Sequence, residues 1–107
     1  MNLTEWSKII HQNAVEHGWW EEERGFPEIV ALCHAELSEA LEEYRDHKPD
    51  IYYSENKKPE GTMVELADCL IRILDYFGSQ DVPVDDLVEM KHDYNKTRPY
   101  KHGGKRI

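Results

Sequence analysis

The spacing of apolar residues in this chain is helical along most of its length, and glycine or proline stands at nearly every interruption. Four helices are predicted, over residues 3–17, 27–46, 62–78 and 84–97. The polar segment 47–61, with two prolines and a final glycine, is expected to be a loop. No segment alternates apolar and polar residues as a half-buried strand does. The fold class is therefore all-α, a bundle of four to five helices.

Capping residues stand near the predicted helix starts. Thr4 is the expected N-cap of the first helix, and Thr62 that of the third. Glu65 follows Thr62 by three residues, which is the spacing of a capping box.

The length of 107 residues predicts one domain with a modest core. Residues 1–97 form its helical part and residues 98–107 a basic tail of the same domain.

Cys33 and Cys69 lie in helical, apolar surroundings without metal-binding spacing, and we expect free thiols. No apolar run approaches the roughly 20 residues of a membrane span, and the N-terminus lacks a signal-peptide core, so we expect a cytoplasmic protein without membrane contact.

Charge is distributed unevenly along the chain. Residues 1–90 hold 21 acidic and 7 basic side chains, whereas residues 91–107 hold one acidic and 6 basic ones. This layout argues against a broad basic face for a nucleic acid polymer. It fits a small anion, such as a phosphate, held between an acidic core and a basic tail.

Two acidic pairs stand on the second and third predicted helices. Glu36 and Glu39 form the first pair, and Glu65 and Asp68 form the second. Residues at i and i+3 project from the same side of a helix, so two facing helices gather four carboxylates. Crowded carboxylates repel one another, and Mg²⁺ or Mn²⁺ prefers such oxygen ligands. The pattern therefore predicts a divalent metal site.

Helical wheels place the two pairs in different surroundings. Glu36 falls inside the apolar arc of its helix, where an unpaired charge is costly. On the third helix, a narrow polar stripe stands opposite a wide apolar arc; its members are Glu65, Asp68, Arg72 and Asp75. This stripe is either an ordinary solvated face or the wall of a site between helices or subunits.

The order of the two acidic pairs, E-x-x-E and then E-x-x-D beyond a loop, resembles the MazG-like, all-α nucleoside triphosphate pyrophosphohydrolase superfamily. The aromatic-rich HGWWEEERGFPE before the second helix is similar to the entry segment of some members. The ending K-x-x-x-N-x-x-R-P-Y-K-H-G-G-K, from Lys91 to Lys105, resembles that of a MazG-like subgroup. The resemblance thus covers most of the chain.

This resemblance implies an oligomeric bundle, as a homodimer or homotetramer. It implies Mg²⁺-dependent hydrolysis of a nucleoside triphosphate, with ribose or deoxyribose, to the monophosphate and pyrophosphate. Glu36, Glu39, Glu65 and Asp68 carry over as metal ligands. Independently of the resemblance, a glutamate that is not fully used as a ligand can take the proton of the attacking water, and Glu39 is the first candidate for this role, with Glu36 as the alternative. Asp75, Lys91, Asn95, Arg98 and Lys105 carry over as substrate-binding residues, the last four as phosphate contacts.

Two other functions compete with this one. A carboxylate di-iron bundle needs a Glu-x-x-His pair on each of two helices. This chain has one such pair, Glu89 and His92. The second is a non-enzymatic helical dimer, such as a regulator that kept the scaffold.

Overall fold

The computed structural model describes residues 1–104 and residue 106. Its elements are α1 (Leu3–Glu16), α2 (Phe26–Arg45), β1 (Tyr52–Tyr53), β2 (Pro59–Glu60), α3 (Thr62–Ser79), α4 (Val84–Lys96) and α5 (Lys101–Gly104). The mostly helical fold confirms the all-α prediction, and the four long helices begin and end within about a residue of their predicted bounds. None of the four predicted helices lies in the basic tail, but the tail contains the single turn α5.

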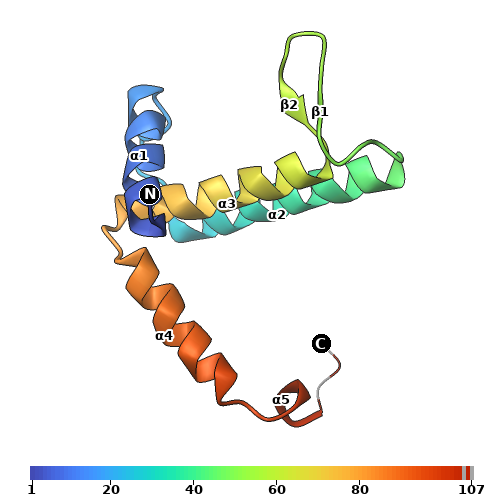
Figure 1. Ribbon diagram of the computed structural model, residues 1–107. Coiled ribbons are helices and arrows are strands. Elements are labelled where there is room, and N and C mark those ends of the chain that lie inside the picture. Colours follow the sequence, from blue (N-terminus) through green and yellow to red (C-terminus); the bar gives the residue numbers. More distant parts are fainter. Residues whose placement is uncertain (105, 107) are drawn as a thin grey trace.

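The antiparallel pair of α2 and α3 forms the body of the molecule, with the two helices side by side along their length (Figure 1). Ile29, Cys69 and Leu74 are buried on these two helices. Cys33 and Cys69 are free thiols, as expected.

Helix α1 crosses one end of this pair at close range. Ser7 on α1 is fully buried. A Cβ atom at Gly78 of α3 would stand only 2.3 Å from the carbonyl oxygen of Ser7. The two backbones therefore approach as closely as they do because residue 78 has no side chain.

Asp85, in the first turn of α4, ties that helix to the start of α1. Its carboxylate accepts hydrogen bonds from the backbone N–H groups of Leu3 (3.1 Å) and Thr4 (3.0 Å), and from the Thr4 hydroxyl (2.6 Å). The predicted N-cap at Thr4 is wrong, because the N-cap is Asn2, whose side chain accepts from the Glu5 N–H at 2.8 Å. Thr4 instead uses its hydroxyl to join the two helices.

The segment 47–61, expected to be a plain loop, contains a short β-hairpin in which Tyr52 pairs with Glu60. The Tyr52 hydroxyl donates to Glu43 of α2 at 2.8 Å, which anchors one edge of the hairpin. Strands of two residues are too short to show alternation, so apolar periodicity does not predict them.

The start of α3 also differs from the expectation. Its N-cap is Gly61, at φ 120°, and Thr62 is the first helical residue. The Thr62 hydroxyl donates to Asp50 at 2.6 Å instead of capping the helix. No capping box forms, because Glu65 turns toward other carboxylates.

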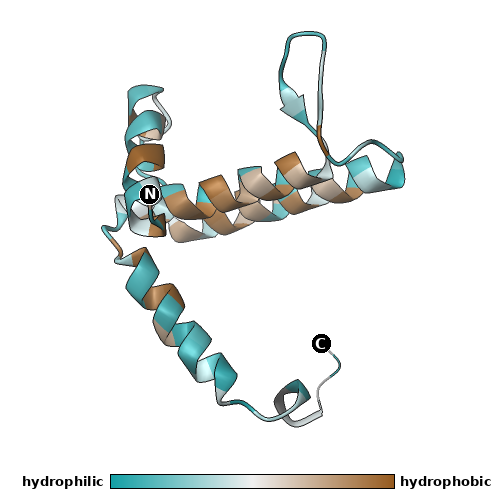
Figure 2. Cartoon of the chain, in the orientation of Figure 1, coloured by the Kyte–Doolittle hydropathy of each residue, from teal (hydrophilic) through white to brown (hydrophobic). Residues whose placement is uncertain are grey.

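Helix α4 extends away from the α2–α3 pair, so it does not cover the outer surface of that pair (Figure 1). The exposed apolar residues of the two helices include Leu37, Leu41, Tyr44, Met63, Leu66, Leu70 and Ile73. Brown, hydrophobic stretches run along both helices in Figure 2. Much of the apolar arc of α3 is therefore exposed, although Leu74 is buried, and its polar stripe faces inward. Among the described residues, no helix combines the length and apolar character needed to cross a membrane.

Candidate metal centre

Three of the four predicted metal ligands meet between α2 and α3. Oxygen atoms of Glu36, Glu65 and Asp68 all lie within 4.8 Å of one another. Glu36 is buried and the other two are half-buried. The interpretation of the α3 polar stripe as a solvated face is therefore wrong for this part of the helix, since its carboxylates point toward α2.

Glu65 shows most clearly how crowded this cluster is. Burial, hydrogen bonds with Glu39 and Glu36, and the charges of Glu39 and Asp68 raise its pKa to about 7. Among the described residues, its Oε2 atom is the one buried side-chain oxygen or nitrogen without a hydrogen-bond partner. A buried carboxylate oxygen without a partner is costly, and a cation would remove that cost. The donor set thus suits Mg²⁺.

Glu39 completes the cluster from its solvent side. Its side chain is exposed, yet it hydrogen-bonds with both Glu36 and Glu65. Asp68 has a raised pKa, first because of burial and then because of the Glu36 charge. All four predicted ligands are therefore brought together, with Glu39 more accessible than the others.

Arg72 also contacts the cluster, although it was not predicted as a site residue. Its Nε donates to Glu36 Oε1 at 2.8 Å. Burial alone raises the pKa of Glu36, but the hydrogen bond from Arg72, the interaction with Glu39 and the Arg72 charge bring that pKa below its usual value. The available signal was its position one helical turn after Asp68, on the same polar stripe.

A cavity of about 300 Å³ adjoins the cluster between α1, α2 and α3. Glu36, Asp68 and Arg72 form one wall, and the Trp19 ring and Arg24 line another part of it. The size and mixed apolar and polar lining suit a small organic ligand.

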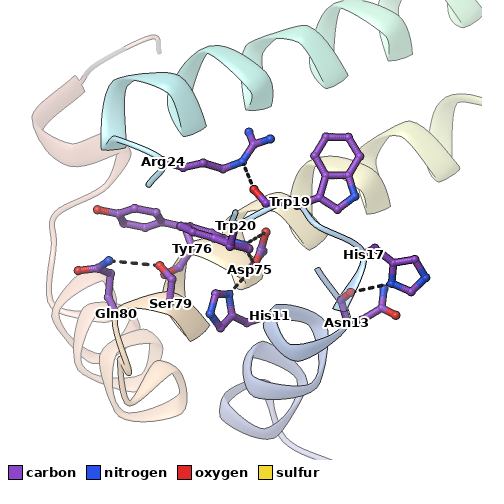
Figure 3. Close-up of polar contacts among 10 residues, drawn as sticks. All are labelled: His11, Asn13, His17, Trp19, Trp20, Arg24, Asp75, Tyr76, Ser79 and Gln80. Atoms are coloured by element: carbon purple, nitrogen blue, oxygen red, sulfur yellow. Dashed lines mark hydrogen bonds and ion pairs between the residues drawn. The ribbon is translucent and has the colours of Figure 1, made fainter. Parts of the chain in front are cut away.

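Asp75, the predicted nucleotide contact, lies in the same cavity (Figure 3). Its Oδ1 accepts from Trp20 Nε1 at 3.0 Å and lies 2.9 Å from His11 Nδ1. Asp75 therefore holds α1 and the segment between α1 and α2 in place, and its carboxylate belongs to the cavity wall.

A second cavity, of about 470 Å³, lies on the hairpin side of the cluster. Glu39 and Glu65 line it together with Lys48 and Lys58. The charge of Lys58 lowers the pKa of Asp68, although burial raises that pKa more. These two lysines were not predicted as site residues, because the segment that carries them was treated as a loop of unassigned role.

The predicted phosphate contacts of the tail lie elsewhere in the same chain. Lys91 and Asn95 are exposed on α4, and neither they nor Arg98 line either cavity. Lys91 Nζ and Arg98 Cζ stand 5.0 Å and 6.0 Å from the centre of the Tyr94 ring. Lys105 lies outside the described residues.

The described residues contain one group of three or more potential metal ligands, and it holds no histidine. Glu89 and His92 stand apart from it on α4. The arrangement therefore offers none of the paired Glu-x-x-His ligands of a di-iron bundle.

No protein-family model, curated protein or solved structure matches this chain, so the interpretation depends on the residues themselves.

Proposed function

We propose that this protein is a Mg²⁺-dependent nucleoside triphosphate pyrophosphohydrolase of MazG-like type, which releases a monophosphate and pyrophosphate. The observation that carries the proposal is the set of oxygens from Glu36, Glu65 and Asp68 within 4.8 Å of one another. The buried, unpartnered Oε2 of Glu65 supports it, because a cation would give that atom a partner.

In this proposal Glu36, Glu39, Glu65 and Asp68 hold Mg²⁺, and Mn²⁺ suits the same oxygens. When bound, the metal supplies positive charge for the phosphate oxygens, where negative charge develops during cleavage. The protein itself positions the groups and excludes water, since phosphoryl transfer needs little covalent help.

Glu39 is assigned as the base that takes a proton from the attacking water. Glu36 is less suited to this role, because it is buried inside the cluster. Glu39 is exposed at the edge of the cluster, where water reaches it.

The 300 Å³ cavity is assigned to the nucleoside part of the substrate. Trp19 offers an aromatic surface for a base, and Asp75 and Arg24 offer polar contacts at its wall. The cavity adjoins the cluster through Glu36 and Asp68, so a ligand in it reaches the carboxylates with its phosphates.

The tail residues Lys91, Asn95, Arg98 and Lys105 are assigned to the phosphates of a site on a second copy. Within one chain, α4 runs away from the cluster, so its cations serve a neighbouring subunit of a homodimer or homotetramer. The protein acts in the cytoplasm in this proposal.

Release of pyrophosphate from a panel of ribo- and deoxyribonucleoside triphosphates tests the proposal. Wild-type protein is expected to release it only with Mg²⁺, and Glu36→Gln is expected to abolish release while the helical circular dichroism spectrum stays unchanged. Glu89→Gln, on the exposed face of α4, is the matched control and is expected to keep full activity. Near wild-type turnover by Glu36→Gln would refute the ligand assignment.

A further inference from the structure

Arg72 is the cation bonded directly to the carboxylate cluster in the described part of the chain. Its Nε donates to Glu36 at 2.8 Å, and the Glu36 side chain is only 10 % exposed. The bond spans from α3 to α2, so it closes the cluster on the side of the 300 Å³ cavity.

This ion pair engages one oxygen of a carboxylate that a metal ion also needs. Glu36 Oε1 accepts from Arg72, and Glu36 is one of the three carboxylates within 4.8 Å of one another. A divalent cation beside these carboxylates would repel the guanidinium and compete with it for the same negative charge. Arg72 and a metal ion therefore compete for the Glu36 carboxylate.

The guanidinium has a second place to bind. Arg72 is about one-third exposed and lines the cavity, whereas the hydrogen bond that it makes to the described residues uses Nε alone. Its two terminal amino groups make no hydrogen bond to the described residues and remain available as donors. A planar guanidinium presents paired donors that match two oxygens of a phosphate.

We propose that Arg72 is a built-in counter-ion which a divalent cation displaces from Glu36, and whose released guanidinium then binds a phosphate oxygen of the nucleotide in the adjoining cavity. The proposal rests on the proposed function for the identity of the ligand. It adds an order of events: without metal, Arg72 neutralises the cluster, and with metal it becomes a phosphate-binding residue.

The two roles predict effects of opposite sign for one substitution. Arg72→Met removes the cation that competes with the metal. The Mg²⁺ affinity of the nucleotide-free protein, measured by calorimetry, is therefore expected to rise about threefold to tenfold. Binding of a non-hydrolysable α,β-methylene nucleotide at saturating Mg²⁺ is expected to weaken about tenfold or more, because a charged phosphate contact is lost.

Two further variants separate this role from a loss of structure. Arg72→Lys keeps the charge without the paired donors, so it is expected to leave Mg²⁺ affinity near that of the wild type and still weaken nucleotide binding. Arg45→Met removes an exposed arginine whose partner is Glu42 on the same helix, and is expected to change neither constant. Circular dichroism and the melting temperature report whether each variant is folded.

The outcomes distinguish this inference from the proposed function. Suppose that wild-type protein binds Mg²⁺, and that Arg72→Met neither raises the Mg²⁺ affinity nor lowers the nucleotide affinity. The inference about Arg72 is then overturned, while the proposed function stands. Weaker Mg²⁺ binding by folded Arg72→Met also overturns it, because Arg72 then supports the metal instead of competing with it. If wild-type protein binds no Mg²⁺ at all, both proposals are wrong.

Discussion

At the scale of single residues, the cluster concentrates negative charge where water is largely excluded, and Glu65 responds most strongly. Its pKa of about 7 means that it carries a proton in the folded, metal-free protein at pH values where it is ionised in the unfolded chain. The folded state therefore binds more protons than the unfolded state between about pH 4.5 and about pH 7.

The expected result is a metal-free melting temperature that falls as the pH rises through this range and levels off above it. Glu65→Gln removes the titrating group, so the pH dependence is expected to be flatter than in the wild type. Thermal unfolding in a chelating buffer at several pH values measures this, and Glu89→Gln, on exposed α4, should keep the wild-type slope. A wild-type stability that rises with pH between 5 and 7 would contradict the raised pKa of Glu65.

The residues of the cluster were predictable because their i, i+3 spacing alone places each pair on one side of a helix. Arg72 and Lys58 were not predicted. The pairing of Arg72 with Glu36 joins positions 36 residues apart, and Lys58 reaches the site from a hairpin that the sequence did not reveal. Contacts of this kind depend on how the helices are set against each other, which helical periodicity does not determine.

At the scale of elements, the positions of the helices depend on a few close contacts. The crossing of α1 over α3 leaves no room at Gly78, where a Cβ would lie 2.3 Å from the Ser7 oxygen and 2.6 Å from His11 Cβ. Because the nearest atom belongs to the α1 backbone, that helix must shift to admit even a methyl group.

We expect Gly78→Ala to lower the free energy of unfolding by about 1–3 kcal/mol, although alanine favours helix more than glycine does. Denaturant unfolding measures the change. Gly25→Ala is the matched control, since a Cβ there meets nothing closer than 3.7 Å. Equal stabilities for the two variants would show that the helix crossing is not as close as described.

The link between α4 and α1 depends on Asp85. Its pKa is lowered, first by the hydrogen bond from the Thr4 side chain and then by backbone N–H groups. Asp85→Ala is expected to lower the melting temperature by a few degrees, because the start of α1 loses its acceptors, and to expose α4 to limited proteolysis. Asp86→Ala removes the exposed carboxylate next to it and is expected to change neither measurement.

The elements themselves were largely predictable, because glycine and proline mark the helix ends in the sequence. The orientation of α3 was not. A helical wheel shows that α3 has an apolar arc and a polar stripe, but it does not tell which of them faces α2. In this chain the carboxylates face inward, whereas Leu66, Leu70 and Ile73 of the apolar arc are exposed, against the usual order for a single chain.

At the scale of the whole molecule, the exposed part of that apolar arc predicts a partner. The radius of gyration is 16.5 Å, against about 13 Å for a compact domain of this length. Few apolar side chains are buried, whereas Leu41 and Leu70 on the open surface are 56 % and 50 % exposed. A surface of this kind is typical of an interface.

We expect a dimer or larger species in sedimentation at micromolar concentration. Leu70→Glu is expected to shift it toward monomer, since a charge would be buried in the interface. Ile9→Glu, at 51 % exposure on α1, is the matched control and is expected to keep the wild-type assembly. A wild-type monomer that retains activity would contradict this prediction.

The assignment of the tail to a neighbouring subunit has its own test. Glu36→Gln and Arg98→Ala chains are each expected to be inactive or strongly impaired, the second through loss of a phosphate contact. When the two are mixed and allowed to exchange subunits, a hybrid has one site with its carboxylates and the opposite tail intact. Activity should therefore return in the mixture, and its absence would place Arg98 in the site of its own chain or outside the site.

The bonds from Leu3 and Thr4 to Asp85 join positions more than 80 residues apart. On the ribosome, the first helix is made early but does not receive these acceptors until residue 85 has been synthesised and has left the exit tunnel. Because domains generally fold as units during synthesis, these two parts of the fold join only after residue 85 has emerged. A ribosome stalled before that point should carry a nascent chain whose first helix is still open to protease.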